Sequence, residues 1–265
     1  MAAKQDTYHR DHWVEVSAER HEAYEAMFTW RQELEPLLAG ADLQPGQSVV
    51  DYGCGPGQLT VEMAGRVAPG GSVTGLDINA DFVARTNARA AEAGLDASAS
   101  ARLLEGPVLP VGDASMDRVV CKSVLEYVDD PAAVLAEFHR ILKPGGRAHV
   151  VDSDWRMFAL EPVGHARASR LFEAASPAYR TPEIGRRLYG LMGAAGFREL
   201  KVSIFAGADV TGRRAAVVRN MADYAREFGR MPTAEIDAIA AEVEAAIAEG
   251  RYLMVLPQFV VSGLR

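Results

Sequence analysis

Short apolar runs alternate with amphipathic stretches along most of this 265-residue chain. Apolar runs bounded by glycine, proline or aspartate predict buried β-strands, and apolar residues three or four positions apart predict helices. The predicted strands cover residues 48–52, 72–77, 97–105, 117–122, 148–151, 201–206 and 252–264. Helices are predicted at 57–67, 80–93 and 130–142, whereas the crossover at 107–115 shows no helical period. This alternation predicts an α/β, doubly wound, mostly parallel sheet.

Further helices are predicted outside the alternating strands and helices, both after the fifth strand and before the first. They are predicted at 161–176, 183–195, 213–228 and 233–248, within insertions at about 155–196 and 211–249. Before the first strand, residues 8–39 are helical in pattern and unusually rich in aromatic and basic side chains: Tyr8, His9, His12, Trp13, His21, Tyr24, Phe28, Trp30 and Arg31. This segment must pack on an edge of the sheet or cover a ligand cleft. We therefore distinguish a helical N-terminal segment, residues 1–47, from an α/β domain, residues 48–265.

The first predicted strand ends in a glycine-rich turn, residues 51–57, with the sequence Asp-Tyr-Gly-Cys-Gly-Pro-Gly. Glycine has no Cβ, so this backbone can bend tightly and a bound molecule can approach it closely. The free N–H groups at the start of the next helix face the same place. A dinucleotide fingerprint, G-x-G-x-x-G, is absent because Gln58 or Thr60 fills its last position. The spacing therefore disfavours NAD and FAD.

A carboxylate stands at the tip of the second predicted strand. Asp77 follows the turn by one β-α unit, and an acid at this point can accept hydrogen bonds from both hydroxyls of a ribose. The alternative is that Asp77 caps the helix that follows it. The joint occurrence of the turn and the acid favours ribose binding.

Four motifs in this order resemble the class I S-adenosylmethionine-dependent methyltransferases, in particular the ubiquinone-methyltransferase-like small-molecule branch. They are the Asp-x-Gly-x-Gly-x-Gly turn, the acid Asp77, the pair Leu109-Pro110, and a Lys-Pro-Gly-Gly turn at 143–146 before an apolar strand. The resemblance covers about residues 45–155. It implies a Rossmann-like seven-stranded sheet with an antiparallel last strand, S-adenosyl-L-methionine as cofactor, and methyltransferase activity. It also implies that the helical segment 1–47 forms a lid, for which an outer amphipathic helix is the alternative.

The resemblance assigns the cofactor-binding residues one by one. They are Asp51, Gly53, Cys54, Gly55, Gly57, Asp77, Ile78, Glu105, Gly106, Lys122 and Ser123. Glu105 stands where the family more often has aspartate beside the adenine amino group, and Val111 replaces the usual aromatic residue. Lys122 ends a predicted strand and Ser123 follows it; open sheets bind ligands at this end of their strands, so we expect both residues near the methionine end of the cofactor. The alternative is that these two residues only cap the strand.

Methyl transfer from a sulfonium depends mainly on positioning and desolvation, so its catalytic residues are hard to find in a sequence. Asp154 is the first candidate for orienting or deprotonating an acceptor, because it follows the fifth strand beside Trp155; a turn-capping aspartate is the alternative. His12 and His165 are further candidates, with solvated surface histidines as the alternative. His149 falls inside a strand and is expected to be a buried, hydrogen-bonded histidine.

Composition and charge narrow the possible partners. The formal net charge is −8 and the pI is near 5.3, whereas nucleic-acid binding usually leaves a basic stripe, so no nucleic-acid partner is expected. We find no run of about eighteen apolar residues, the length that a membrane span needs. Cys54 and Cys121 show no metal-ligand spacing. We expect a cytoplasmic protein without a metal site, either a monomer or a homodimer.

Together these features predict in-line methyl transfer to a small organic molecule, on oxygen, nitrogen or carbon, in a cleft at the carboxyl ends of the strands. The helical insertions would enlarge a roof over that cleft, which suits a small acceptor. A competing function uses the same fold without methyl transfer, because fold alone does not fix function. The protein would then bind the cofactor while serving a cyclisation, a rearrangement or a scaffold role.

Overall fold

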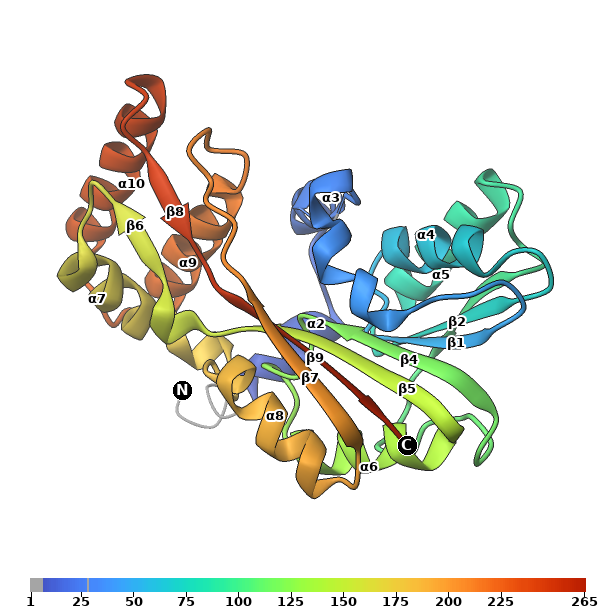
Figure 1. Cartoon of the computed structure of the whole chain (residues 1–265). Coiled ribbons are helices and arrows are strands. Elements are labelled where there is room, and N and C mark those ends of the chain that lie inside the picture. Colours follow the sequence, from blue (N-terminus) through green and yellow to red (C-terminus); the bar gives the residue numbers. More distant parts are fainter. Residues whose placement is uncertain (1–6, 28) are drawn as a thin grey trace.

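The predicted strands form one seven-stranded sheet in the computed structural model, which describes residues 7–27 and 29–265 (Figure 1). The strand order is β3-β2-β1-β4-β5-β9-β7. The strands are β1 (Ser48–Tyr52), β2 (Ser72–Asp77), β3 (Ala99–Leu103), β4 (Met116–Lys122), β5 (Leu142–Ser153), β7 (Arg198–Phe205) and β9 (Gln258–Leu264). The first five strands pair in parallel, whereas β9 is antiparallel to both β5 and β7. The predicted Rossmann-like sheet with an antiparallel last strand is therefore confirmed.

Helices cover both faces of this sheet (Figure 1). α4 (Gln58–Val67) and α5 (Ala80–Glu92) lie on one face, and α6 (Pro131–Ile141) and α8 (Ile184–Ala194) lie on the other. Side chains of a strand alternate between the faces. In β1, Val49 therefore joins the core beneath α4, whereas Val50 joins the core beneath α6. Burial on both faces explains why the strands contain short continuous apolar runs.

The predicted start of α6 is confirmed. Asp130 caps this helix, because its carboxylate accepts hydrogen bonds from the N–H groups of Ala132 and Ala133, both at 3.0 Å. Pro131 occupies the first turn, where its missing N–H costs nothing. No helix joins β3 to β4, as the lack of a helical period at 107–115 predicted.

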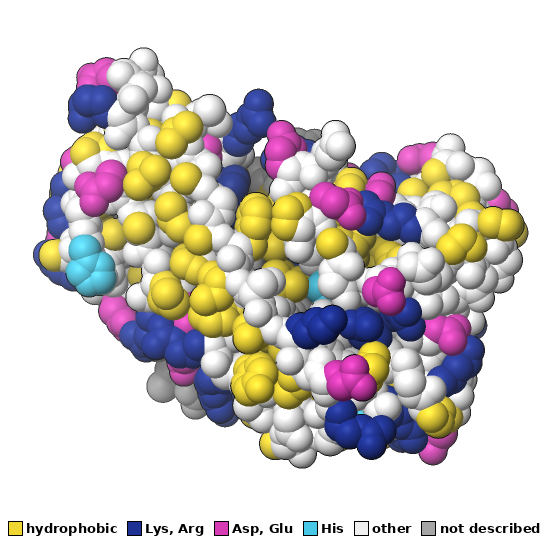
Figure 2. All heavy atoms as spheres, viewed as in Figure 1, with side chains coloured by type: hydrophobic (Ala, Val, Ile, Leu, Met, Phe, Trp, Pro, Cys, Tyr) yellow, Lys and Arg dark blue, Asp and Glu magenta, His cyan; other side chains and the backbone are white. Residues whose placement is uncertain are grey.

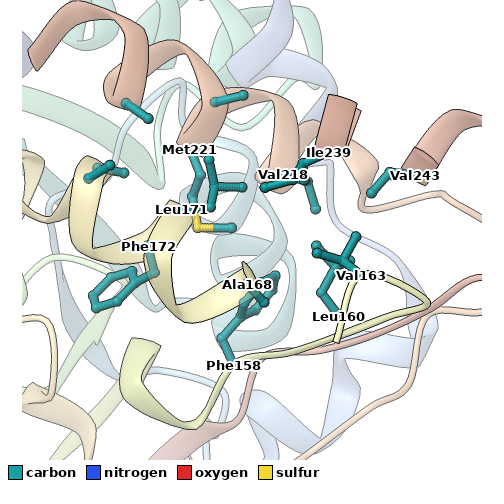
Figure 3. Packing of buried hydrophobic residues seen from close by; sticks show 14 of the residues in the cluster. Phe158, Leu160, Val163, Ala168, Leu171, Phe172, Val218, Met221, Ile239 and Val243 are labelled. Atoms are coloured by element: carbon teal, nitrogen blue, oxygen red, sulfur yellow. The ribbon is translucent and has the colours of Figure 1, made fainter. Parts of the chain in front are cut away.

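The C-terminal insertions build a second lobe with its own core (Figures 1 and 3). It contains α7 (His165–Ala175), α9 (Ala215–Phe228), α10 (Thr233–Ala248) and a two-stranded sheet of β6 (Ala159–Glu161) and β8 (Leu253–Val255). Figure 3 shows Leu171 of α7, Met221 of α9 and Ile239 of α10 in this core. The lobe therefore folds around its own buried side chains rather than on the main sheet.

The prediction of one final strand at 252–264 is wrong. The segment forms two strands, β8 and β9, which belong to different sheets. Pro257 lies between them and has no N–H to donate to a ladder, while its carbonyl accepts a hydrogen bond from Asp154 N at 3.0 Å. Strand β6 escaped prediction because three residues are too few to show a period.

The N-terminal segment is helical but broken into short pieces. It contains α2 (Tyr8–Val14), α3 (Ala18–Met27) and the 3₁₀ turns η1 (Gln32–Leu37) and η2 (Ala39–Ala41). Two further 3₁₀ turns, η3 (Trp155–Met157) and η4 (Ser176–Ala178), precede and follow α7. Residues 1–6 and Phe28 of the predicted lid segment lie outside the described residues.

Charged side chains of both signs are interspersed on the face shown in Figure 2. Many arginines pair with acids, as Arg66 does with Glu35 at 2.7 Å. Within the described ranges, every helix is too short or too polar to cross a bilayer.

Candidate functional site

The glycine turn between β1 and α4 forms a cradle at the carboxyl edge of the sheet. Gly53, Gly55 and Gly57 all adopt positive φ angles, of 71°, 53° and 82°. A Cβ on Gly53 would lie 2.3 Å from Val124 Cγ2, and one on Gly57 would lie 2.6 Å from the Thr86 side chain. A Cβ on Gly55 would meet no atom within 4 Å. Gly53 and Gly57 therefore permit close packing, whereas Gly55 faces open space in which a ligand can approach the backbone.

Asp77 lies beside this cradle, at the end of β2. Its Oδ2 accepts a hydrogen bond from Gly55 N at 2.8 Å, and its Oδ1 accepts one from Asn79 N at 2.9 Å. Burial raises the pKa of Asp77, and these backbone hydrogen bonds oppose the rise. Asn79, not Asp77, caps α5 by accepting a hydrogen bond from Phe82 N at 2.9 Å. The capping alternative for Asp77 is therefore wrong, and its carboxylate is held at the edge of the cradle.

Asp51 and Cys54 are buried within the glycine turn. The Asp51 carboxylate is buried and accepts a hydrogen bond from Thr60 Oγ1 of α4 at 2.6 Å. Burial raises its pKa to about 7, which the Thr60 hydrogen bond opposes. Cys54 is also buried, and burial raises its pKa well above the usual range, so its thiol is an apolar filler rather than a nucleophile.

The segment after β4 forms the next part of the edge. Ser123 adopts a left-handed conformation with φ of 58°, which non-glycine residues rarely do and which concentrates at ligand-binding positions. Burial lowers the pKa of the neighbouring Lys122. Asp152, at the end of β5, accepts hydrogen bonds from the N–H groups of Val124 at 3.2 Å and Leu125 at 2.8 Å. Asp152 therefore fixes this segment, a role that sequence analysis did not assign to it.

Glu105 and Gly106 lie just beyond β3, where both are exposed. The end of β3 is tied to β2 by a hydrogen bond from Leu104 N to the Asp77 carbonyl at 2.8 Å. Ile78 directly follows Asp77 and is half-buried. The structure therefore brings all the predicted cofactor residues to the carboxyl ends of β1 to β4.

The three catalytic candidates lie in very different surroundings. Asp154 is fully buried; it accepts a hydrogen bond from Arg156 N at 3.1 Å and forms an ion pair with Arg186. This geometry favours the turn-capping interpretation of Asp154. His165 is exposed at the start of α7, in the second lobe. His12 is only 9% exposed, so the interpretation of it as a solvated surface histidine is wrong.

Helix α2 crosses the carboxyl edge of the sheet. At one end, the Trp13 carbonyl accepts a hydrogen bond from Asn79 Nδ2 at 2.9 Å, two residues from Asp77. At the other end, His9 Nε2 contacts Asp129 Oδ1 at 2.8 Å, and the Tyr8 hydroxyl donates to Glu227 of α9. These contacts join the N-terminal segment to the Asp77 side of the cradle, to the segment after β4 and to the second lobe.

Three rings of α2 pack against three tyrosines from later in the chain. We call these six residues the aromatic cluster: Tyr8, His12, Trp13, Tyr127, Tyr179 and Tyr224. The His12 ring centroid lies 4.7 Å from that of Tyr8, 5.9 Å from Tyr127 and 5.5 Å from Tyr224. Tyr127 also contacts Trp13 at 5.0 Å and Tyr179 at 5.5 Å. The three tyrosines beyond residue 100 were not predicted, because their only signal is proximity in space.

An open hollow of about 830 Å³ lies elsewhere, along α3, α4 and α5. Charged groups at this hollow pair with one another, as Arg89 does with Glu25. Its lining includes neither the glycines of the turn nor Asp77.

Known proteins share this fold and part of this sequence. Residues 50–150 match the family model described as a methyltransferase domain. Nocamycin O-methyltransferase of Saccharothrix syringae is 37% identical over 147 residues, which are 53% of this chain and 50% of that protein. The chain spans about half the length of the curated relatives it matches.

Two solved structures extend the likeness over nearly the whole chain, at identities that establish the fold alone. Phosphoethanolamine N-methyltransferase 2 of Haemonchus contortus, in complex with S-adenosyl-L-methionine, has a TM-score of 0.66 at 16% identity and covers 97% of this chain and 60% of that one. The cyclase SpnF has a TM-score of 0.60 at 16% identity and covers 98% and 96%. Residues 50–150 therefore match a methyltransferase domain, and the sheet around them has the fold of the S-adenosylmethionine-dependent methyltransferases.

Proposed function

We propose that this protein transfers the methyl group of S-adenosylmethionine to a small organic acceptor at the carboxyl edge of its sheet. The single observation that carries the proposal is the cradle. Gly55 leaves space for a ligand against the backbone, and the Asp77 carboxylate stands beside it. Two hydroxyls of a ribose are the chemical groups that such a carboxylate and turn would receive. The residues of the cradle therefore fit the cofactor.

Each part of the edge has a proposed task in holding the donor. Asp77 accepts the ribose hydroxyls, and Gly53, Gly55 and Gly57 let the donor approach the turn. Ile78, Glu105 and Gly106 border the adenine, and Lys122 and Ser123 border the methionine end, with Cys54 and Asp51 beneath the turn. When bound, S-adenosylmethionine supplies a methyl group that its sulfonium has already activated. The protein then mainly needs to align the acceptor and keep water away.

Three observations support a small acceptor. A related protein is named as an O-methyltransferase of nocamycin. The second lobe and α2 lie next to the carboxyl edge through the contacts of Tyr8 and His9. Aromatic rings rather than a charged track lie next to the cradle, and aromatic side chains are typical of sites for small organic ligands.

We further propose that residues 1–47 act as the lid over this edge. Removing residues 1–13 is expected to abolish turnover, because the deletion takes away Tyr8, His12 and most of α2. The melting temperature should fall by only a few degrees, since the described part of the deletion, residues 7–13, lies outside the cores of the main sheet. Full activity in the truncated protein, or loss of the fold together with activity, would favour an ordinary edge helix instead.

The proposal is tested in two steps. Calorimetry should show micromolar binding of S-adenosylmethionine and S-adenosylhomocysteine and negligible binding of NAD. The protein is then incubated with methyl-labelled donor and a metabolite extract of its host, and label in a small molecule supports transfer. Tight binding with no label in any product would favour a cyclisation, rearrangement or scaffold role. Tight NAD binding without binding of S-adenosylmethionine would reject the proposal altogether.

A further inference from the structure

Two adjacent residues of α2 hold buried polar nitrogens without a hydrogen-bond partner among the described residues. They are His12 Nε2 and Trp13 Nε1. The buried His149 shows the usual alternative, because its Nδ1 contacts Ser262 Oγ at 2.8 Å and its Nε2 contacts the Leu37 carbonyl at 2.7 Å. Buried polar atoms are normally paired in this way. The two nitrogens of α2 therefore point to a ligand rather than to a structural role.

The protonation of His12 follows from its one hydrogen bond. Its Nδ1 contacts the Tyr8 carbonyl, which can only accept, so Nδ1 carries the proton and donates it. Burial lowers the pKa of His12 to about 4, assisted by the charges of Arg20 and His9 and opposed by Asp11 and the Tyr8 hydrogen bond. The ring is therefore neutral at pH 7, and Nε2 presents a lone pair. Trp13 Nε1 carries a hydrogen and can only donate.

The position of this pair links it to the cradle. The Trp13 carbonyl is bound by Asn79, which also contacts the Asp77 carboxylate through its N–H. Both rings of the pair contact Tyr127, in the segment that begins with Ser123. An acceptor held by His12 and Trp13 would therefore lie between the ribose side and the methionine side of the donor.

We infer that His12 and Trp13 bind a planar aromatic acceptor with two neighbouring oxygens, and that His12 is the general base for methylation of its hydroxyl. The inference rests on the proposed function and names its acceptor class. A hydroxyl donates to His12 Nε2, and the neighbouring oxygen accepts from Trp13 Nε1. The rings of Tyr8, Tyr127 and Tyr224 supply flat apolar walls for an aromatic molecule.

The acceptor oxygen forms a bond to the methyl carbon while the methyl–sulfur bond breaks, and that electron pair stays on sulfur. The hydroxyl proton passes to His12 Nε2 and then to solvent. No oxidant, reductant or metal is required.

A cationic amine is a poorer occupant of this place. An ammonium group has no hydrogen-bond acceptor, so it would leave Trp13 Nε1 unpaired. A carbon nucleophile would leave Trp13 Nε1 without an oxygen unless it also carried one. The combination of one lone pair and one N–H matches a hydroxyl beside another oxygen most directly.

Binding of a probe tests the inference without turnover. In the presence of S-adenosylhomocysteine, 2,3-dihydroxynaphthalene should bind at least about tenfold more tightly than 2,3-dimethoxynaphthalene, which has the same rings but no hydroxyl to donate. Equal binding of the two probes, or binding of neither, overturns the inference. If S-adenosylhomocysteine itself does not bind, the proposed function fails instead, so the two failures are distinguishable.

Variants at position 12 separate a base from a structural residue. In His12→Asn, the amide N–H can still donate to the Tyr8 carbonyl, but nothing replaces Nε2. Turnover should fall at least about a hundredfold while S-adenosylhomocysteine binding and the melting temperature stay near those of the parent. In His12→Gln, an oxygen at the place of Nε2 can still receive the hydroxyl, so kcat should fall while KM changes little. Parent-like turnover of His12→Asn overturns the assignment.

Two further variants complete the test. Trp13→Phe removes the N–H and should raise KM about tenfold with a smaller change in kcat. His139→Gln is the matched control: His139, in the last turn of α6, packs on Phe197 and is not part of the aromatic cluster, so every readout should stay unchanged. The methylated atom is then identified by carbon NMR after transfer from donor with a carbon-13 methyl group to the metabolite extract. An N-methyl or C-methyl product overturns the inference and leaves the proposed function standing.

Discussion

The two sides of the candidate site, one at the glycine cradle and one at the aromatic cluster, consist of different kinds of residue. At the centre of the proposed donor side are a glycine turn and a carboxylate, both within residues 51–79, and their contacts are mainly those of backbone N–H groups. The proposed acceptor side consists of rings from α2, the segment after β4, the residue after η4 and α9. The centre of the first side is local in sequence, whereas the second exists only after distant segments have packed together.

This difference changes what a mutation should do on each side. Backbone conformations with positive φ tolerate few residue types, so a single methyl group can abolish either folding or binding. A cluster of rings distributes its contacts over several side chains, so loss of one of them should affect turnover more than folding. Four predictions test this contrast, from the largest expected effect to the smallest.

Two glycines of the same turn should respond in opposite ways. Gly57→Ala places a Cβ 2.8 Å from the Thr86 Cα of α5, at a positive φ, and should destabilise the fold by roughly 2–5 kcal/mol. Gly55→Ala meets no atom within 4 Å, so it should cost only about 1–2 kcal/mol of backbone strain while blocking donor binding. Urea unfolding and calorimetry measure the two effects. Equal loss of stability in both variants would contradict the view of Gly55 as the open position.

Asp77→Ala should weaken donor binding far more than it weakens the fold. Two hydroxyl hydrogen bonds to a carboxylate contribute about 3 to 5 kcal/mol in total, which corresponds to at least a hundredfold change in Kd. Asp81→Ala is the matched control, because this nearby acid lies in the first turn of α5 and its side chain is 81% exposed. A change in Kd below about threefold for Asp77→Ala would remove Asp77 from the donor site.

Asp51 should make the unliganded protein less stable as the pH rises. The folded-state pKa of about 7 exceeds the ordinary value of 3.8, so the folded protein binds the proton more tightly than the unfolded chain does. The resulting stability is fully present below about pH 4 and is lost as the pH approaches 7, by up to about 4 kcal/mol.

Asp51→Asn cannot ionise and can still accept the Thr60 hydrogen bond. At pH 8 it should therefore exceed the parent in unfolding free energy by about 2–4 kcal/mol, whereas at pH 4 the two should be alike. Comparison with the parent cancels the contribution of Asp152, whose pKa burial also raises to about 7. Parallel stability curves from pH 4 to pH 8 would show that Asp51 does not carry this proton.

The smallest effect is expected at the anchor of α2. Asp129 is 54% exposed and contacts His9 at 2.8 Å and Arg10 at 3.2 Å. Exposed ion pairs contribute about 0.5 kcal/mol, so Asp129→Ala should speed dissociation of S-adenosylhomocysteine by only about twofold. Stopped-flow fluorescence measures this rate. A tenfold or larger change would mean that α2 is held mainly by charge and not by its rings.

The sequence by itself determined the sheet and the glycine cradle with Asp77 beside it. The apolar runs predicted β1, β2 and β4 because strands buried on both faces need short continuous apolar stretches. The glycine spacing and Asp77 predicted the cradle because few other residues adopt those backbone angles or end that strand. His149 was correctly expected to be buried and paired, since its position inside a central strand leaves it no other environment.

Only the tertiary structure decided the aromatic cluster and the contacts of several acids. Asp152 and Asp154 are near neighbours in sequence, yet one fixes the segment after β4 while the other pairs with Arg186. The break at Pro257 and the short strand β6 also depend on pairing between distant segments. His12 became buried only because α9 and Tyr127 pack against α2. The spacing of apolar residues shows which face of a helix or strand is apolar, but it does not show which distant element will cover that face.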